Sequence, residues 1–219
     1  MSADKTPDLF AFWARIAPDA RLHPADEEVF SRIGNPGFDL RCLPAAYSGP
    51  LKTARVVLLY LSPGFSAFDL KEAGSPEGQA RYVRRRKGTA PLPSKEVHES
   101  AWRWWCSRTK CFGPWEELRD QVAVLNIGAY HSRRFKDWGL LAALPSSRMS
   151  IAWAQSVLFP EALDGKRVVI CLRAARYWGL DGGRHYPASL YAPPVTVGGH
   201  MHHGAMREKI VKAVKAVLR

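Results

Sequence analysis

The sequence predicts an α/β protein, a three-layer α/β/α sandwich around a mainly parallel central sheet of about four strands. Short, continuous apolar runs occur at residues 55–61, 121–127 and 166–172, as in strands buried on both faces. Segments with helical apolar spacing separate these runs, and this alternation is typical of parallel sheets. Hydrophobic residues make up 47% of the 219 residues, enough for one large domain that spans residues 1–219.

The first half of the chain contributes helices and one strand. Residues 8–17 have helical apolar spacing, and residues 24–33 begin with a proline and three acids, which favours a second helix in an N-terminal helical segment over 1–50. The apolar run 55–61 is expected to be a buried strand that enters a tight turn. Residues 74–95 are rich in Gly, Pro, Arg and Lys, and we predict a long basic loop there.

The second half repeats the alternation of strands and helices. A fourth strand is expected at residues 194–197, after the runs at 121–127 and 166–172. The closing helix has an apolar face and lysines elsewhere around it. Helical segments are expected at 114–120, 148–158, 173–178 and 206–218.

Charge is distributed unevenly along the chain. The formal net charge is +12, but residues 1–40 carry −3 and residues 81–110 carry +7, with further basic residues at 131–136 and in the last helix. Local basic surfaces of this kind typically meet polyanions. No uncharged apolar stretch reaches about 18 residues, and the N-terminus lacks a basic region followed by an apolar run. We therefore expect a cytoplasmic monomer without a membrane partner.

The cysteines predict neither a disulfide framework nor a cofactor. Cys106 and Cys111 form a C-x4-C pair, which is not a common zinc spacing, and Cys171 lies inside an apolar run. With Cys42, the total of four matches the number of thiolates in an iron–sulfur cluster, which remains an alternative. We expect reduced structural thiols, no metal and no cofactor.

Two loops that follow predicted strands carry candidate binding residues, because sites in parallel sheets form beyond the strand carboxyl ends. In the first loop, Ser62, Pro63 and Gly64 form a turn that lets backbone amides approach a ligand, and Phe65 can present its ring; the alternative is an ordinary turn with a buried Phe. In the second, Asn126 ends a buried strand, and its amide suits reading the edge of a base. The polar and basic side chains that follow are Tyr130, His131, Ser132, Arg133 and Arg134.

The loop before the last helix holds three histidines, His200, His202 and His203. They could bind a metal, but two are adjacent and no Asp, Glu or Cys nearby completes a site. A single histidine facing a ligand is the preferred interpretation, and solvated loop histidines are the alternative.

A basic and aromatic insert spans residues 74–110. Cations interleaved with aromatic rings suit single-stranded or distorted nucleic acid, although tryptophans are more often packed in the core. The predicted phosphate contacts are Arg84, Arg85, Arg86 and Lys87, with Arg133 and Arg134 from the later loop, and the tryptophans are Trp102, Trp104 and Trp105.

Taken in order, these motifs resemble the uracil-DNA glycosylase superfamily. Ser62-Pro63-Gly64 stands where the family has a Pro-centred turn, Val124-Leu125-Asn126 where it ends a strand with a base-reading Asn, and Gly199-His200-Met201 where it carries a His before the final helix. Segments 62–66, 129–132 and 144–147 are also similar to a bacterial branch with Asn-Pro-Gly-Tyr-Ser, Pro-Tyr-His-Ser and Leu-Pro-Ser-Gln motifs. The resemblance covers roughly residues 55–215.

The resemblance implies DNA binding and hydrolysis of the N-glycosidic bond of a modified base flipped from the stack, as in DNA repair. Phe65 would stack on the base and Asn126 would read its edge. His200 would stabilise the departing base, and Ser62 stands where the family positions water with Asp or Asn. The alternatives are a non-catalytic nucleic-acid-binding protein on the same fold, and an enzyme that processes nucleotides or nucleosides.

Overall fold

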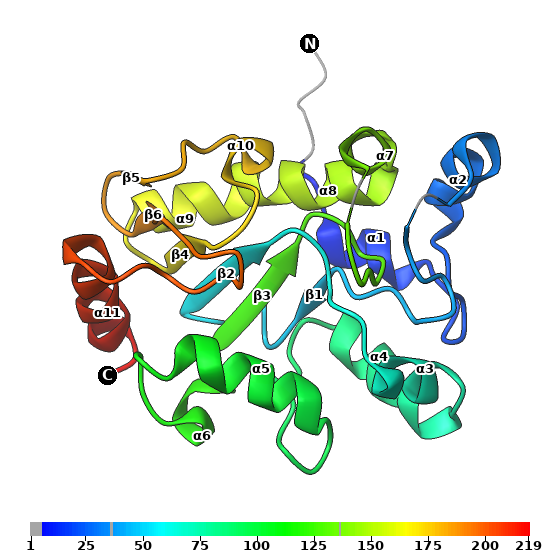
Figure 1. The fold of residues 1–219 in the computed structure, drawn as a ribbon, viewed down its shortest axis with the longest axis horizontal. Coiled ribbons are helices and arrows are strands. Elements are labelled where there is room, and N and C mark those ends of the chain that lie inside the picture. The colour runs from blue at the N-terminus through cyan, green and yellow to red at the C-terminus, as the bar shows by residue number, and fades with distance from the viewer. Residues whose placement is uncertain (1–5, 36, 136) are drawn as a thin grey trace.

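A six-stranded mixed sheet lies at the centre of the structure (Figure 1). The computed structural model describes residues 6–35, 37–135 and 137–219. The strands follow the order β1-β3-β2-β4-β6-β5; the four inner strands are parallel, and β1 and β5 run antiparallel to their neighbours. They are β1 (Tyr47–Ser48), β2 (Val56–Tyr60), β3 (Val122–Asn126), β4 (Val168–Cys171), β5 (Arg184–His185) and β6 (Leu190–Ala192).

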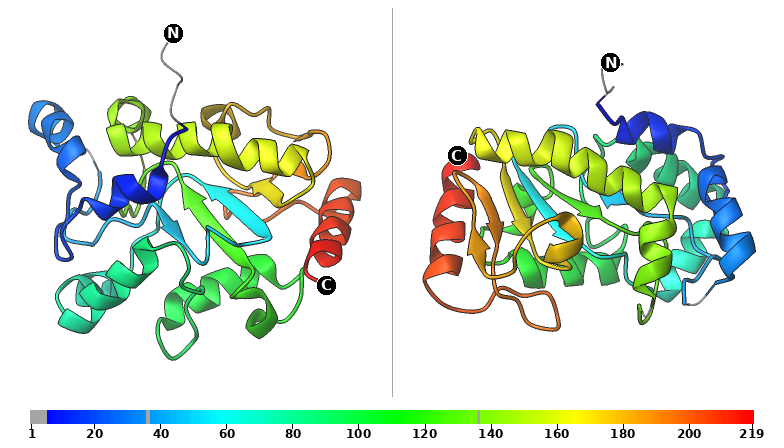
Figure 2. Two further views of the ribbon diagram at one scale, coloured as in Figure 1. Left: turned by 180° about the vertical axis from the view of Figure 1, so that it is seen from behind. Right: turned by 90° about the horizontal axis from the view of Figure 1, so that it is seen from above.

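Helices cover both faces of this sheet (Figures 1 and 2). None of the helices in the described ranges is long and apolar enough to cross a membrane. The helices of the first half are α1 (Leu9–Ala14), η1 (Pro24–Asp26), α2 (Glu27–Ile33), α3 (Ala67–Ala73), α4 (Pro76–Arg86), α5 (Glu99–Thr109) and α6 (Trp115–Leu118). Those of the second half are α7 (Trp138–Ala143), α8 (Pro145–Trp153), η2 (Ala154–Leu158), α9 (Phe159–Leu163), α10 (Ala175–Trp178) and α11 (Ala205–Val217).

The inner strands are buried on both faces because their side chains alternate between two cores. Val57 and Leu59 of β2 join a core with α1, α8 and α9, whereas Val56 and Leu58 join a second core with α6 and α11. This arrangement explains why the runs at 55–61, 121–127 and 166–172 are apolar throughout, and it confirms an α/β fold with buried strands.

The sheet is larger and more mixed than the four strands predicted from sequence. The prediction of a strand at 194–197 is wrong. The fourth inner strand is β6, which ends at Ala192, and Val195 makes only an isolated bridge with Met201. Pro193 and Pro194 follow β6 at once and offer no N–H to continue the ladder. The antiparallel edge strands β1 and β5 have two residues each, too few for a periodic signal.

The long basic loop predicted at 74–95 is also wrong, because α4 occupies residues 76–86. The Ser75 hydroxyl accepts from the Gly78 amide, and Pro76 occupies the first turn, so the segment carries its own helix start. A Cβ atom on Gly78 would meet the Glu72 carbonyl oxygen at 2.0 Å. Glycine therefore allows α4 to pack closely on α3, which brings Arg81 and Arg85 of α4 to Glu72 of α3.

The register of β2 and β3 brings the two candidate loops together. Tyr60 pairs with Asn126, so both strands end at the same level. The loops are then joined by backbone hydrogen bonds from Gly128 to Leu61 (2.8 Å) and from Ser132 to Pro63 (3.2 Å). Residues that lie more than 60 positions apart in the sequence thus form one surface at the carboxyl edge of the sheet.

Candidate functional site

A cavity of about 250 Å³ lies at the carboxyl ends of β2 and β3. It is lined by the turn after β2, the end of β3, and residues from α3, α4 and α5. Six of the residues singled out from sequence meet there: Ser62, Pro63, Gly64, Phe65, Asn126 and His131. The place of this cavity agrees with the rule that ligands bind beyond the carboxyl ends of parallel strands.

Asn126 presents a fixed amide to the cavity. Its Nδ2 atom donates to the Ala45 carbonyl at 2.9 Å, and the residue is 6% exposed. Its Oδ1 atom accepts no hydrogen bond from a described residue. The amide is therefore oriented by the segment before β1 and offers an acceptor to a ligand. Ser62 lines the same cavity, and its hydroxyl makes no hydrogen bond within the described ranges.

Asp69 is the carboxylate of the cavity, and sequence reasoning did not assign it a role. Its Oδ2 atom accepts from both the amide and the hydroxyl of Ser66 at 2.7 Å, and its Oδ1 atom lies 3.4 Å from His98 Nε2. Burial by itself raises the pKa of Asp69, but the hydrogen bonds from His98 and Ser66 and the proximity of His131 outweigh it and lower the pKa to about 2. Asp69 is therefore ionised at neutral pH.

Two imidazoles flank this carboxylate. His131 Nδ1 lies 2.6 Å from the Gly64 carbonyl oxygen and 3.7 Å from Asp69 Oδ2. Burial lowers the pKa of His131, so its ring is neutral in neutral solution, with the proton on Nδ1. His98 accepts the Ala101 amide on Nδ1, so its proton lies on Nε2 and points to Asp69. Each ring thus directs one nitrogen to a protein oxygen.

Aromatic side chains from α5 form one wall of the cavity. Trp104 and Trp105 are half-buried; they pack on the core through Tyr60, with ring centroids at 5.1 and 5.7 Å, and also line the cavity. Phe65 faces the same space from the turn after β2. The two tryptophans thus pack on the core, as expected, and in addition face the cavity.

The residues missed by sequence reasoning carry two recognisable signals. Ser66 and Asp69 have the S-x-x-D spacing of a capping box, which starts α3 and makes the two side chains neighbours. His98, Ala101 and Trp105 recur at helical spacing, so they share one face of α5, and all three line the cavity. The first signal marks a local contact, but neither shows which cavity the side chains enter.

Two residues predicted to bind substrate, Tyr130 and Ser132, do not line the cavity. The Tyr130 hydroxyl donates to Asp26 at 2.5 Å and accepts from the His23 amide, and the residue is 1% exposed. It fastens the loop after β3 to the N-terminal helices. Ser132 is buried, with no partner for its hydroxyl within the described residues, and it does not line the cavity.

The structure places His200 outside the lining of the cavity, on a turn held against its rim. Tyr60 donates to the Gly199 carbonyl at 3.4 Å, and Arg108 donates to the Gly198 carbonyl at 2.9 Å. Slight burial and the nearby Arg108 and Lys110 lower the pKa of His200. The turn contacts the cavity wall through its backbone, and the apolar Val197, 90% exposed, lies near its tip.

The four cations from Arg84 to Lys87 point in different directions because they lie on a helix. Arg85 lines the cavity and is paired with Glu72 at 2.7 Å. Arg86 donates to the carbonyls of Trp13 and Ile16, so it holds α1 in place. Arg84 and Lys87 are exposed.

Arg133 and Arg134 are exposed, and neither lines the cavity. The Arg133 guanidinium lies 4.4 Å from the centroid of the Phe65 ring, and Arg108 covers Trp104 at 3.8 Å. Lys136, from the basic stretch 131–136, lies outside the described residues.

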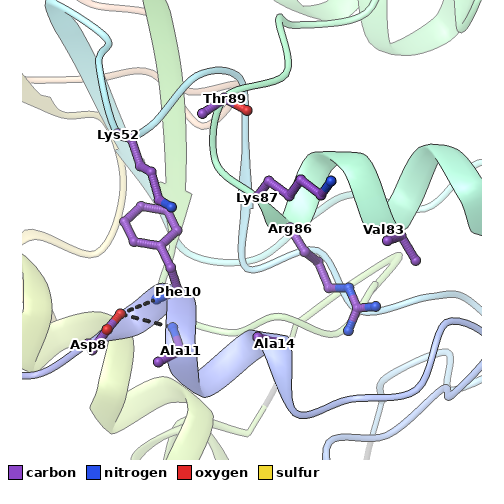
Figure 3. Close-up of a pocket in the computed structure, with 9 residues that line it drawn as sticks. All are labelled: Asp8, Phe10, Ala11, Ala14, Lys52, Val83, Arg86, Lys87 and Thr89. Atoms are coloured by element: carbon purple, nitrogen blue, oxygen red, sulfur yellow. Dashed lines mark hydrogen bonds between the residues drawn. The ribbon is translucent and has the colours of Figure 1, made fainter.

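A second, wider hollow of about 750 Å³ lies between α1 and α4 (Figure 3). Lys52, which precedes β2, places it away from the carboxyl edge of the sheet. Its polar groups serve the fold: Asp8 accepts the Phe10 and Ala11 amides as the cap of α1, and Lys52 lies over the Phe10 ring. Lys87 lines this hollow and does not line the cavity at the strand ends.

Metal ligands do not gather within the described ranges, where no three His, Cys, Asp or Glu side chains could hold one ion. The four cysteines are free thiols, and burial raises the pKa of both Cys42 and Cys171 to about 12. These two cysteines are buried, whereas Cys106 and Cys111 are half-buried.

No protein-family model, curated protein or solved structure matches the chain. The assignment of a function therefore depends on the chemistry of the cavity.

Proposed function

We propose that the cavity at the ends of β2 and β3 binds a single nucleobase presented by a nucleic acid, and that the protein hydrolyses the N-glycosidic bond of that base. The observation that carries this proposal is the convergence of the Ser62–Phe65 turn, Asn126 and the aromatic side chains on one space of about 250 Å³. A space of this size suits one ring system rather than a large ligand. Aromatic walls favour a planar ring, and the Asn126 amide offers an acceptor to its edge.

Cations around the cavity favour a base that belongs to a nucleic acid. Arg133 lies over Phe65, Arg134 follows it and is also exposed, and Arg108 lies over Trp104. Phosphates on either side of a flipped nucleotide would meet such cations, which give affinity without sequence choice. An enzyme that processes nucleosides, which carry no phosphate, would not need exposed arginines at this rim.

The carboxylate of Asp69 favours an enzyme over a non-catalytic binding protein. Glycosidic cleavage builds positive charge on the sugar, and an ionised carboxylate stabilises that charge. Ser62, with its free hydroxyl, could hold a water molecule. The position of His200 outside the cavity favours the second candidate, a nucleic-acid-binding protein without catalysis on the same fold.

The test is release of a base from labelled duplexes and single strands that carry uracil, hypoxanthine, xanthine or an alkylated purine. We expect release from at least one of these substrates, and its loss in Asn126→Ala. Gln121→Ala is the matched control, because it removes an amide at the other end of β3. His200→Ala measures the role that the resemblance gives to this histidine. Binding without release would favour the non-catalytic candidate.

Salt dependence tests the nucleic-acid partner separately. We expect affinity for a DNA strand to fall with added salt, and the Arg133→Gln/Arg134→Gln variant to reduce the slope of log K against log salt by about 1 to 2. Lys52→Gln/Lys166→Gln is the control, because these lysines precede β2 and β4 at the opposite edge. Affinity that does not change with salt would contradict a nucleic-acid partner.

A further inference from the structure

The cavity holds an ionised carboxylate that the fold does not neutralise. The donors to Asp69 are Ser66 and His98, and the other ring nitrogen of His98 accepts the Ala101 amide. Burial lowers the pKa of His131, and its Nδ1 atom donates to the Gly64 carbonyl rather than to Asp69. The side chain of Asp69 keeps 15% of its surface exposed and lines the cavity. A negative charge therefore remains beside the bound ligand.

Arginines in and around the cavity lining do not neutralise the charge of Asp69. Arg85 is held at 2.7 Å by the buried carboxylate of Glu72, which also binds Arg81. Arg108 lies against Trp104 and donates to the carbonyls of Trp104 and Gly198. Arg133 lies over Phe65 and is exposed to solvent.

The side chains of Asn126, His98 and His131 direct their N–H groups to protein oxygens rather than to a ligand. Both imidazole N–H groups are turned to protein oxygens, and the Asn126 amide nitrogen donates to Ala45 while its Oδ1 atom is free of described partners. A base that departs as an anion requires a donor to stabilise it. These three side chains are poorly arranged for an anionic leaving group, and His200 does not line the cavity.

We propose that the cavity selects a cationic base, an N-alkylated purine such as 7-methylguanine within a nucleic acid. This inference rests on the proposed function and narrows it to one substrate class. Aromatic rings attract a cation through their π faces, as Tyr60, Phe65, Trp104 and Trp105 would, and Asp69 attracts it through its charge. A neutral base of the same shape would gain neither the cation–π attraction nor the attraction to the charge of Asp69.

The chemistry of an alkylated purine fits a cavity whose imidazole and amide N–H groups are engaged by the protein. When the bond from the sugar carbon to the purine nitrogen breaks, its electron pair moves to the ring and cancels the positive charge. The base leaves neutral and needs neither protonation nor an oxyanion donor. Water adds to the sugar carbon, its oxygen forms the new bond, and its proton passes to solvent.

The first experiment compares three nucleosides by quenching of tryptophan fluorescence in the purified full chain. At mildly acidic pH the 7-methylguanosine ring is cationic, whereas guanosine and uridine are neutral. We expect 7-methylguanosine to bind about tenfold more tightly than guanosine, and this preference to disappear in Asp69→Asn. Glu99→Gln is the matched control, because Glu99 is an exposed carboxylate on α5 and is paired with Arg103.

The second experiment measures release of 7-methylguanine and of uracil from matched duplexes against the rate without protein. We expect release of the methylated base by the wild type and by Glu99→Gln, and at least about a tenfold slower rate in Asp69→Asn. The comparison of cationic and neutral ligands in the wild type does not depend on how well any variant folds.

The outcomes separate this inference from the proposed function. Equal affinity for guanosine and 7-methylguanosine, or release of uracil alone, would overturn selection of a cation and leave base binding intact. The same holds if Asp69→Asn keeps the full preference. If no nucleoside binds and no base is released from any duplex, the proposed function fails and this inference fails with it.

Discussion

Two aspartates in this protein, Asp26 in the core and the partly buried Asp69, have different surroundings. Asp26 is 0% exposed; Tyr130 donates its hydroxyl to one oxygen and Ser146 donates its amide to the other, at 2.5 and 2.9 Å. Asp69 receives a comparable number of hydrogen bonds from Ser66 and His98, but it lines a cavity. Burial and hydrogen bonding are thus shared by both carboxylates. What differs is that protein closes around Asp26, whereas part of Asp69 remains open to a ligand.

The largest effect is expected for stability at Asp26. The Asp26→Ala variant leaves the Tyr130 hydroxyl and the Ser146 amide buried without a partner. We expect the free energy of unfolding to fall by about 3 kcal/mol, measured by urea denaturation. Asp164→Ala removes an exposed carboxylate and should change stability by less than about 0.5 kcal/mol. An Asp26→Ala protein as stable as the wild type would remove the contrast between the two sites.

A smaller effect on stability and a larger effect on binding are expected at Asp69. In Asp69→Asn the amide oxygen can still accept from Ser66, so the free energy of unfolding should fall by no more than about 1 kcal/mol. Affinity for 7-methylguanosine should fall about tenfold. Denaturation and fluorescence titration of the same preparation would measure both quantities. A large loss of stability without a change in affinity would place Asp69 with the structural carboxylates.

The Tyr130→Phe variant tests whether Tyr130 belongs to the structural site. It removes the hydrogen bond to Asp26 and the one from the His23 amide and leaves the ring in place, so we expect a loss of at least about 1 kcal/mol in unfolding free energy. Base release and nucleoside affinity should not change, because Tyr130 does not line the cavity. Loss of affinity in a fully folded variant would return Tyr130 to the binding residues predicted from sequence.

The smallest effect is expected from the pH response of His131. Its folded-state pKa is lowered by burial, so folding disfavours the charged ring. This group contributes stability that is present above its unfolded pKa of about 6.5 and is lost as pH falls towards the folded value. The His131→Asn variant keeps a donor for Gly64 but does not titrate. Its loss of stability between neutral and mildly acidic pH should therefore be smaller than in the wild type.

Asp69 titrates in a lower range than His131. Its pKa of about 2 lies below the ordinary value of 3.8, so its contribution is present above the ordinary value and is lost as pH falls towards 2. The carboxylate therefore remains ionised through the range where His131 acquires a proton. A protonated His131 would lie 3.7 Å from Asp69 and compete with a cationic ligand, so cation binding should weaken once the pH falls below the folded-state pKa of His131.

The buried strands could be predicted from the sequence, whereas the edges of the sheet could not. The apolar runs behind β2, β3 and β4 arise because both faces are covered, and this leaves a local pattern. The strands β1 and β5 have two residues each, and β6 is a three-residue strand directly before two prolines. Their pairing depends on neighbouring strands that are remote in sequence.

The candidate site divides in the same way. The sequence by itself determined that the Ser62–Phe65 turn and Asn126 lie at strand ends, because the strands before them are marked by continuous apolar runs. Only the tertiary structure decided that Asp69 and His98 meet in the cavity and that Tyr130 does not. These outcomes depend on how α3 and α5 pack against the sheet, and packing between elements is not encoded in local periodicity. It is a tertiary contact, therefore, that makes Asp69 a group facing a ligand and Asp26 a group inside the core.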